Sequence, residues 1–450
     1  MSQHSRQGGE SGTEPRPETE PGLAEELEQE AAREQGAPAG LEHGEDTADR
    51  LAHALQQTMS HPWTVAAGAI LLAVVVGSVM IAFTDERVTA AAGYFFARPA
   101  DTFVALGDAI GGAYSALFRG AVFNPRADGL AAQIRPLTET LNYATPLITA
   151  GLGVALAFRA GLLNIGGQGQ MLIAAAAAGW VAFGVTGLPF GVHTLLAVVA
   201  GIAGGAVWAG IAGVLKARTG AHEVIVTIML NWIAFYLLAY FLATPGLLQA
   251  PGSSNPKTPA TPESAQLPAL LGERYNLHWG FVLALGAVVF VWWLLNRSSQ
   301  GFAFRAVGAN PRAARVAGID VPWATVKVML VAGGLVGVAG ASQVLGQVTT
   351  GFGGDIDAGI GFDAITVALL GGSNPWGVLA AGILFGAFKA GGTAMQASEG
   401  VPNDIVLVVQ SLIVLFIAAP PLVRAIFRLP DPERRRTPRR ARTIKKEAAA

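Results

Sequence analysis

The sequence predicts an all-α polytopic membrane protein with about ten transmembrane helices, some of them broken or re-entrant. Of its 450 residues, 52% are hydrophobic and only 14% are charged, whereas a soluble domain usually carries about 25% charged residues. Glycine is abundant, at 57 residues, and glycine is more frequent in membrane helices than in soluble ones. The charged residues lie mostly outside the apolar runs, as a bilayer requires.

Ten apolar segments are the predicted membrane helices, since a full span needs about 20 mostly apolar residues. The first follows a long acidic stretch instead of a short basic one, so we expect an uncleaved span and not a signal peptide. Phe362–Leu370 is too short for a full span, and Phe103–Phe118 is expected to lie on the membrane as an amphipathic helix. The ten segments are Trp63–Phe83, Leu141–Phe158, Gln168–Thr186, Val192–Leu215, Val224–Ala243, Trp279–Leu295, Trp323–Leu345, Phe362–Leu370, Val378–Thr393 and Ile405–Ala419.

Three regions divide the chain: an acidic tail (1–60), a membrane domain (61–422) and a basic tail (423–450). Few large apolar residues occur in the tails, which predicts disorder. The basic tail is either simply solvated or bound to anionic lipid on the cytoplasmic face. Short loops that contain Arg159, Lys216 and Arg312 carry positive charge. By the positive-inside rule, both ends of the chain are expected in the cytoplasm of a cell-membrane protein.

A glycine-rich segment, Phe158–Gln170, interrupts the apolar sequence after the second predicted span. Non-helical backbone at membrane depth is tolerated only where protein or a water-filled cavity satisfies its polar groups. The segment is therefore either a re-entrant element lining a translocation path or an ordinary cytoplasmic turn. Its candidate path residues are Asn164, Gln168 and Gln170. It lacks the Gly-Lys-Ser/Thr ending of a phosphate-binding loop.

A second polar pattern, Glu223, Thr227 and Asn231, lies along the start of one predicted span. Glu223 stands at the helix start, where the helix dipole favours an anion, so it is either a cap or a path residue. Asn231 lies about two turns further in. Because a buried amide must find partners, Asn231 bonds a neighbouring helix or faces the path. We expect Trp232 beside it as a stacking surface.

The stretch Gly361–Gly377 combines a short apolar run with a Gly-Gly-Ser-Asn-Pro turn. Short segments interrupted by Gly and Pro are the usual sequence pointer to a transport path, so a half-helix is expected; the alternative is a short helix buried among others. Asp363 in this stretch and Gln410 in the last span complete the candidate path. The other ionisable residue deep in a span is Lys389, and no pair of intramembrane carboxylates suggests a proton relay.

The most basic short loop predicts a small capped helix. Asn310 precedes Pro311, which is favoured at the first helical position, and the helix is expected to run to about Ala317 and stop at Gly318. The loop is either a positive-inside anchor or a docking helix for a cytoplasmic partner. Its candidate coupling residues are Gly308, Asn310, Arg312, Arg315 and Gly318.

These four patterns together resemble the permease subunits of ABC importers in the branched-chain amino acid and simple-sugar class, closest to the nucleoside branch. Leu163–Gln170 is similar to the family's Phe-Asn-Ile-Gly-Ala-Glu-Gly-Gln, although Gln168 replaces the Glu and removes a charge. Glu223–Asn231 is similar to its Glu-Val-Ile-x-Thr-Ile-Met-Leu-Asn run. Ala306–Ile319 resembles its coupling loop, and Gly361–Gly377 its Gly-Phe-Asp segment.

The resemblance covers roughly residues 63–420 and implies an assembly. Its partners would be a cytoplasmic ATP-binding subunit, an external solute-binding lipoprotein and a second permease chain within membrane lipid. We expect no cofactor, no metal, no nucleic-acid partner and no bond chemistry on this chain, which lacks Cys altogether. The path offers neutral amides and hydroxyls that both donate and accept, which suits a neutral polar solute, and the resemblance at Glu223–Asn231 implies a nucleoside before a simple sugar. Alternatives are a simple-sugar or branched-chain amino acid permease, or an ion-coupled secondary transporter.

Overall fold

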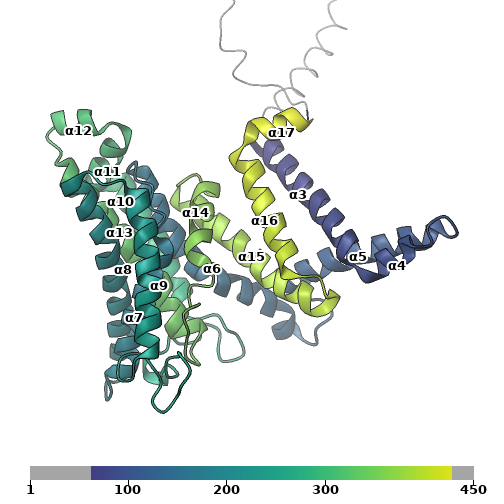
Figure 1. Ribbon diagram of the computed structural model, residues 1–450, viewed down its shortest axis with the longest axis horizontal. Coiled ribbons are helices and arrows are strands. Elements are labelled where there is room, and N and C mark those ends of the chain that lie inside the picture. Colours follow the sequence, from purple (N-terminus) through teal and green to yellow (C-terminus); the bar gives the residue numbers. More distant parts are fainter. Residues whose placement is uncertain (1–61, 428–450) are drawn as a thin grey trace, which may run out of the picture. The chain divides into compact units, whose positions relative to one another are not determined.

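The computed structural model describes residues 62–427. The predicted acidic tail and most of the predicted basic tail lie outside the described residues. Within the described part the chain is helical, and its only strand-like pairing is one isolated bridge between Ala269 and His278. The predicted all-α membrane fold is therefore confirmed (Figure 1).

Six helices in the described residues are long and apolar enough to cross a membrane. A seventh span is formed if α16 (Asn403–Ala418) and α17 (Pro420–Phe427), which bend by 95°, count as one. The predicted count of about ten spans is therefore only loosely matched. The predicted segments that are not among these seven include α7 (Gly167–Gly184), which begins with Gly and Gln, and α14 (Ile360–Leu370), which is only 11 residues long. The six are α6 (Leu130–Arg159), α8 (Val192–Thr219), α9 (Glu223–Ala243), α10 (Gly280–Arg297), α13 (Val321–Ser342) with the π-helical turn η2 (Gln343–Gln347), and α15 (Pro375–Glu399).

Glycine controls how closely the central helices pack. α8 and α13 touch along their lengths, with Gly201 against Gly337 and Gly205 against Gly333. A Cβ added to Gly337 would lie 2.5 Å from the carbonyl oxygen of Gly201, so no larger residue fits without separating the helices. Small residues allow this close backbone approach where lipid gives no hydrophobic drive for helix association.

A second apolar cluster joins the N-terminal helices to the C-terminal ones. It contains side chains from α3 (Pro62–Thr84), α5 (Pro99–Ala121), α15 and α16, with α4 (Glu86–Ala92) packed on α5. α5 is longer than the predicted Phe103–Phe118, because Pro99 starts it and it packs along α15. Its place on the membrane surface stays a prediction. The first five residues of the predicted basic tail, 423–427, belong to α17.

The spans have two distinct ends. At one end lie α11 (Ser299–Ala309) and α12 (Pro311–Val316), directly before α13 (Figure 1). At the other end, η2 receives the Pro-rich loop between α9 and α10, which includes the 3₁₀ turn η1 (Glu263–Ala265): the amide of Leu267 donates to the Leu345 carbonyl at 2.7 Å. Val321–Gln347 has 27 residues, or about 40 Å of helix, which is enough to separate the two ends across a bilayer.

Candidate functional site

The glycine-rich link between α6 and α7 alternates exposed and buried residues, and Gly161 and Leu163 are exposed. Leu162, Asn164 and Gly166 are all inaccessible. The Asn164 side-chain oxygen accepts from the Gly166 amide at 3.0 Å and from Gln170 Nε2 at 2.9 Å. The amide groups of Asn164 and Gln170 are thus satisfied by protein, as a segment at membrane depth would require. The re-entrant element and the cytoplasmic turn both stay predictions.

Asn231 caps α7 from another helix. The N-cap of α7 is Gly166, which has no side chain to bond the free amides of the first turn. Asn231 of α9 supplies the missing oxygen: its Oδ1 accepts from the Gly169 amide at 2.8 Å, and its Nδ2 donates to the Ile165 carbonyl at 3.0 Å. An N-cap oxygen normally bonds this same third amide. Asn231 therefore fixes where α7 begins.

Glu223 also holds the link, in addition to standing at the start of α9. Its carboxylate pairs with Lys216 at 2.6 Å and lies 3.4 Å from the amide of Leu163. Thr227, one turn on, bonds its own helix, and its Cβ lies 3.1 Å from where a Cβ on Gly166 would stand. The predicted residues on α9 thus line one side of the link.

α14 is a half-helix that meets the first turn of α7. A Cβ on Gly167 would lie 2.7 Å from the Gly361 carbonyl oxygen, and a Cβ on Gly361 would overlap the backbone of Gln168. We call this contact of Gly167, Gln168 and Gly361 the α7–α14 junction. With Phe362 half exposed, α14 is not buried all round, which favours the predicted half-helix over a helix enclosed by others.

An ion pair lies beside the junction. Asp363 of α14 bonds Lys389 of α15 at 2.8 Å, and the two side chains are 24% and 19% exposed. Lys389 Nζ also lies 3.4 Å from the carbonyl oxygen of Ala358. Charged side chains are costly where they face lipid within the bilayer, so charged pairs within spans usually face water or protein. This face of α14 and α15 is therefore unsuited to contact with acyl chains.

Sequence reasoning missed two buried polar residues at the same place, Gln343 and Asp357. Gln343 begins the π-helical turn η2, and Asp357 precedes Ala358, a non-glycine residue with a φ of 45°. π turns and strained backbone both concentrate at functional sites. The signal that could have found Asp357 is its position in a glycine-rich run that leads into a half-helix. Gln343 gives no sequence signal.

Two predicted features do not join this cluster. Gln410 is buried on α16, but no hydrogen bond among the described residues connects it to the other candidate path residues. Trp232 is 56% exposed and stacks on Tyr236, with ring centroids 6.2 Å apart. Neighbouring residues of a helix face different directions, so Asn231 reaches α7 while Trp232 does not.

The predicted coupling helix is present with the predicted cap. The Asn310 side chain accepts from the amides of Arg312 at 3.0 Å and Ala313 at 3.1 Å, and Pro311 opens α12. The helix ends before Gly318, whose φ is 83°. Arg312 and Arg315 are exposed, as is Val316 at 91%. α12 therefore presents basic and apolar groups outward.

The segment formed by α11 and α12 contacts the link directly. Gly308 of α11 packs on the backbone of Arg159 and Ala160, and a Cβ on Gly161 would lie 3.2 Å from the Gly308 Cα. Arg159 Nε donates to the Ser373 carbonyl at 2.9 Å, in the turn that follows α14. The link before α7 and the turn after α14 are thus both connected to the end of the spans at which α12 lies.

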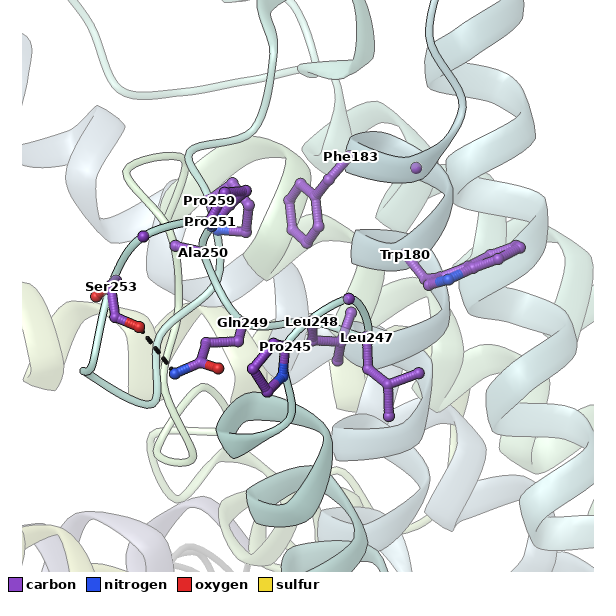
Figure 2. Close-up of a pocket in the computed structure, with 13 residues that line it drawn as sticks. Trp180, Phe183, Pro245, Leu247, Leu248, Gln249, Ala250, Pro251, Ser253 and Pro259 are labelled. Carbon is purple, nitrogen blue, oxygen red and sulfur yellow. Dashed lines mark hydrogen bonds between the residues drawn. The ribbon is translucent and has the colours of Figure 1, made fainter.

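The pocket of about 640 Å³ shown in Figure 2 lies elsewhere, between the far end of α7 and the Pro-rich loop. Trp180 and Phe183 form one wall, and the loop, held by a 2.9 Å bond from Gln249 to the Ser253 carbonyl, forms another. None of its lining residues is a candidate path residue. The predicted path residues thus lie away from this pocket.

Comparison with known proteins identifies the family. Residues 137–418 match the family model described as "Branched-chain amino acid transport system / permease component". The chain is 38% identical to the guanosine ABC transporter permease protein NupP of Bacillus subtilis, over 71% of this chain and 89% of that one. It is 35% identical to the glucose ABC transporter permease protein TsgB13 of Haloferax volcanii, over 62% and 75%. It is 33% identical to the nucleoside ABC transporter permease protein NupB of Lactococcus lactis, over 63% and 79%. No solved structure matches.

Proposed function

This chain belongs to the branched-chain amino acid transport system permease family as an ABC transporter permease, and on that premise we propose that it imports nucleosides across the cell membrane. Nucleosides are favoured because NupP and NupB, which are similar to this chain, are named for guanosine and nucleosides. Family membership favours an ABC permease over the ion-coupled alternative.

The observation that carries the proposal is the α7–α14 junction. α14, which is shorter than a full span, meets the first turn of α7 there by its own first turn, and short helices of this kind line the solute site of many transporters. Amide and hydroxyl side chains lie at and beside the first turn of α7: Gln168 is partly exposed, and Asn164, Gln170 and Thr227 are buried and bonded within the protein. These groups donate and accept, as a neutral polar solute requires. The charges of Asp363 and Lys389 cancel in their ion pair.

Coupling to ATP hydrolysis would enter through α12. We propose that a cytoplasmic ATP-binding subunit holds the exposed face of Arg312, Arg315 and Val316. Movement of α12 would reach the link through Gly308 against Arg159 and Ala160, and would reach α14 through Arg159 and Ser373. Rigid elements in contact can transmit such a displacement. A second permease chain and an external solute-binding lipoprotein would complete the importer, with both ends of this chain in the cytoplasm.

Competition for uptake tests the substrate. Radiolabelled guanosine and uridine are supplied to cells with and without the gene, each with unlabelled nucleoside, glucose or leucine as competitor. We expect the gene to be required for nucleoside uptake, and only nucleosides to compete. If its loss removes uptake of a sugar instead, as the similarity to the glucose permease TsgB13 would allow, the nucleoside assignment is wrong and the permease assignment stands.

A further inference from the structure

We propose that Gln343 and Asp357 bind neighbouring hydroxyl groups of the solute's sugar as it passes the α7–α14 junction. The inference rests on the proposed function, because it names a solute contact at the same site. Gln343 Oε1 and Asp357 Oδ2 are both buried and have no hydrogen-bond partner. The two residues are 3% and 5% exposed. Unpaired buried polar atoms are rare in native proteins and call for an explanation.

The two orphan oxygens belong to one place in the fold. Gln343 Nε2 donates to the Ile356 carbonyl at 3.4 Å, which brings the amide next to Asp357 along the chain. α7 packs against η2, and the backbone carbonyl of Asp357 accepts from the amide of Ile360, the first residue of α14, at 2.7 Å. Three elements therefore meet around these oxygens: the π turn after α13, the first turn of α7 and the loop that leads into α14. All three elements are in contact with, or directly precede, the junction.

The chemistry of the orphan atoms selects the ligand. An amide oxygen and an ionised carboxylate oxygen only accept hydrogen bonds, so the missing partner must donate twice. Neighbouring hydroxyls of a sugar ring offer two donors side by side, and carboxylates commonly bind the hydroxyls of ribose. Ribonucleosides, glucose and other simple sugars share this feature. The site would thus recognise the part that these solutes have in common.

A metal cation is a poorer occupant. Lys389 already places its ammonium group against the carbonyl oxygen of Ala358, the residue after Asp357. α7 and α14 also begin here, and helix N-termini carry partial positive charge. The helix N-termini repel a cation while leaving a neutral donor unaffected, and Asp363 balances the charge of Lys389.

In this structure the junction is closed, with Gly361 against the backbone of Gln168. The orphan oxygens are therefore sealed from solvent and from solute alike. Separation of α7 and α14 would expose them together, and hydroxyl groups would then satisfy both. The acceptors are unpaired in the closed state and would be paired in the solute-bound state. Binding of a solute with the matching hydroxyls would therefore lower the free energy of the open state relative to the closed one.

The test compares guanosine with 2′-deoxyguanosine in the complete transporter, reconstituted with its ATP-binding subunit, partner permease and binding protein. Initial uptake rates at saturating solute are measured for wild type, Gln343→Met and Asp357→Asn. The guanosine to 2′-deoxyguanosine ratio should fall by about tenfold in the variant that loses the acceptor for the 2′-hydroxyl. The guanosine to 3′-deoxyguanosine ratio, measured in the same way, should fall by about tenfold in the variant that loses the acceptor for the 3′-hydroxyl. The binding protein is the same throughout, so its own preference cancels in the comparison.

Asn142→Leu is the matched control. Asn142 on α6 also has a buried side-chain oxygen without a partner, and it lies outside the junction. It should leave the ratio unchanged. Membrane insertion and thermal unfolding, measured for every variant, separate loss of the contact from loss of the fold.

Unchanged ratios in Gln343→Met and Asp357→Asn, with uptake intact, would overturn the proposal. A change in the guanosine to inosine ratio alone would also overturn it, because the contact would then be with the base. If wild type imports no nucleoside, the proposed substrate fails separately, and the ratio is measured with glucose and 2-deoxyglucose instead. The same tenfold fall is then expected.

Discussion

Replacing Asn231 by Ala should weaken the start of α7 and slow transport without changing which solute is chosen. The substitution removes both bonds to the link, from the Gly169 amide and to the Ile165 carbonyl. Loss of an N-cap oxygen costs about 0.5–2 kcal/mol. An interhelical hydrogen bond within a membrane is worth about 0.6 kcal/mol on average and up to about 1.7. We therefore expect a total loss of about 2 kcal/mol in stability.

The measurements are thermal unfolding in detergent and initial uptake rates of two nucleosides. Asn231→Ala should lower the unfolding temperature and reduce both rates by a similar factor. Asn296→Ala is the control, because Asn296 bonds only the Trp292 carbonyl of its own helix and is exposed. If Asn231→Ala unfolds like wild type, or alters the preference between the two nucleosides, Asn231 is not the cap of α7 that we describe.

Three further predictions follow from the contacts. Gly361→Ala should force α7 and α14 apart, at about 1–3 kcal/mol for an overpacked site, and uptake should fall in the reconstituted transporter; wild-type uptake would refute a tight junction. Changing Arg312 and Arg315 together to Glu should abolish ATP-driven uptake while membrane insertion persists, and surviving uptake would remove α12 from coupling. Burial lowers the pKa of His278 to about 4 from 6.5, so the folded state holds this group neutral and loses about 3 kcal/mol of stability as pH falls from about 6.5 to about 4. Unfolding temperatures between pH 7.5 and pH 4 measure this loss, and His278→Asn, which keeps an acceptor for the Gly280 amide, should flatten the dependence.

Features that depend on a few consecutive residues could be predicted from the sequence. The membrane class follows from apolar content, because only helices and closed barrels satisfy their backbone in lipid. The helix at Pro311–Val316 follows from Asn310 and Pro311, whose cap and fixed φ act within one turn. The half-helix α14 follows from a short apolar run that ends in glycines. The number of spans could not be predicted in the same way, since hydropathy cannot distinguish a straight span from a bent pair of helices such as α16 and α17.

Contacts between distant residues were decided by the tertiary structure. The sequence marked Asn231 as a buried amide with an unknown partner, and only packing shows that it caps α7 from 62 residues away. Gln343 carries no local pattern, and the glycine-rich run around Asp357 does not name its neighbours, yet the π turn and the approach to α14 bring the two together. The physical reason is that propensity and hydropathy act over a few residues of chain. Which side chain completes another helix depends instead on glycine-controlled approach distances, such as Gly361 against Gln168.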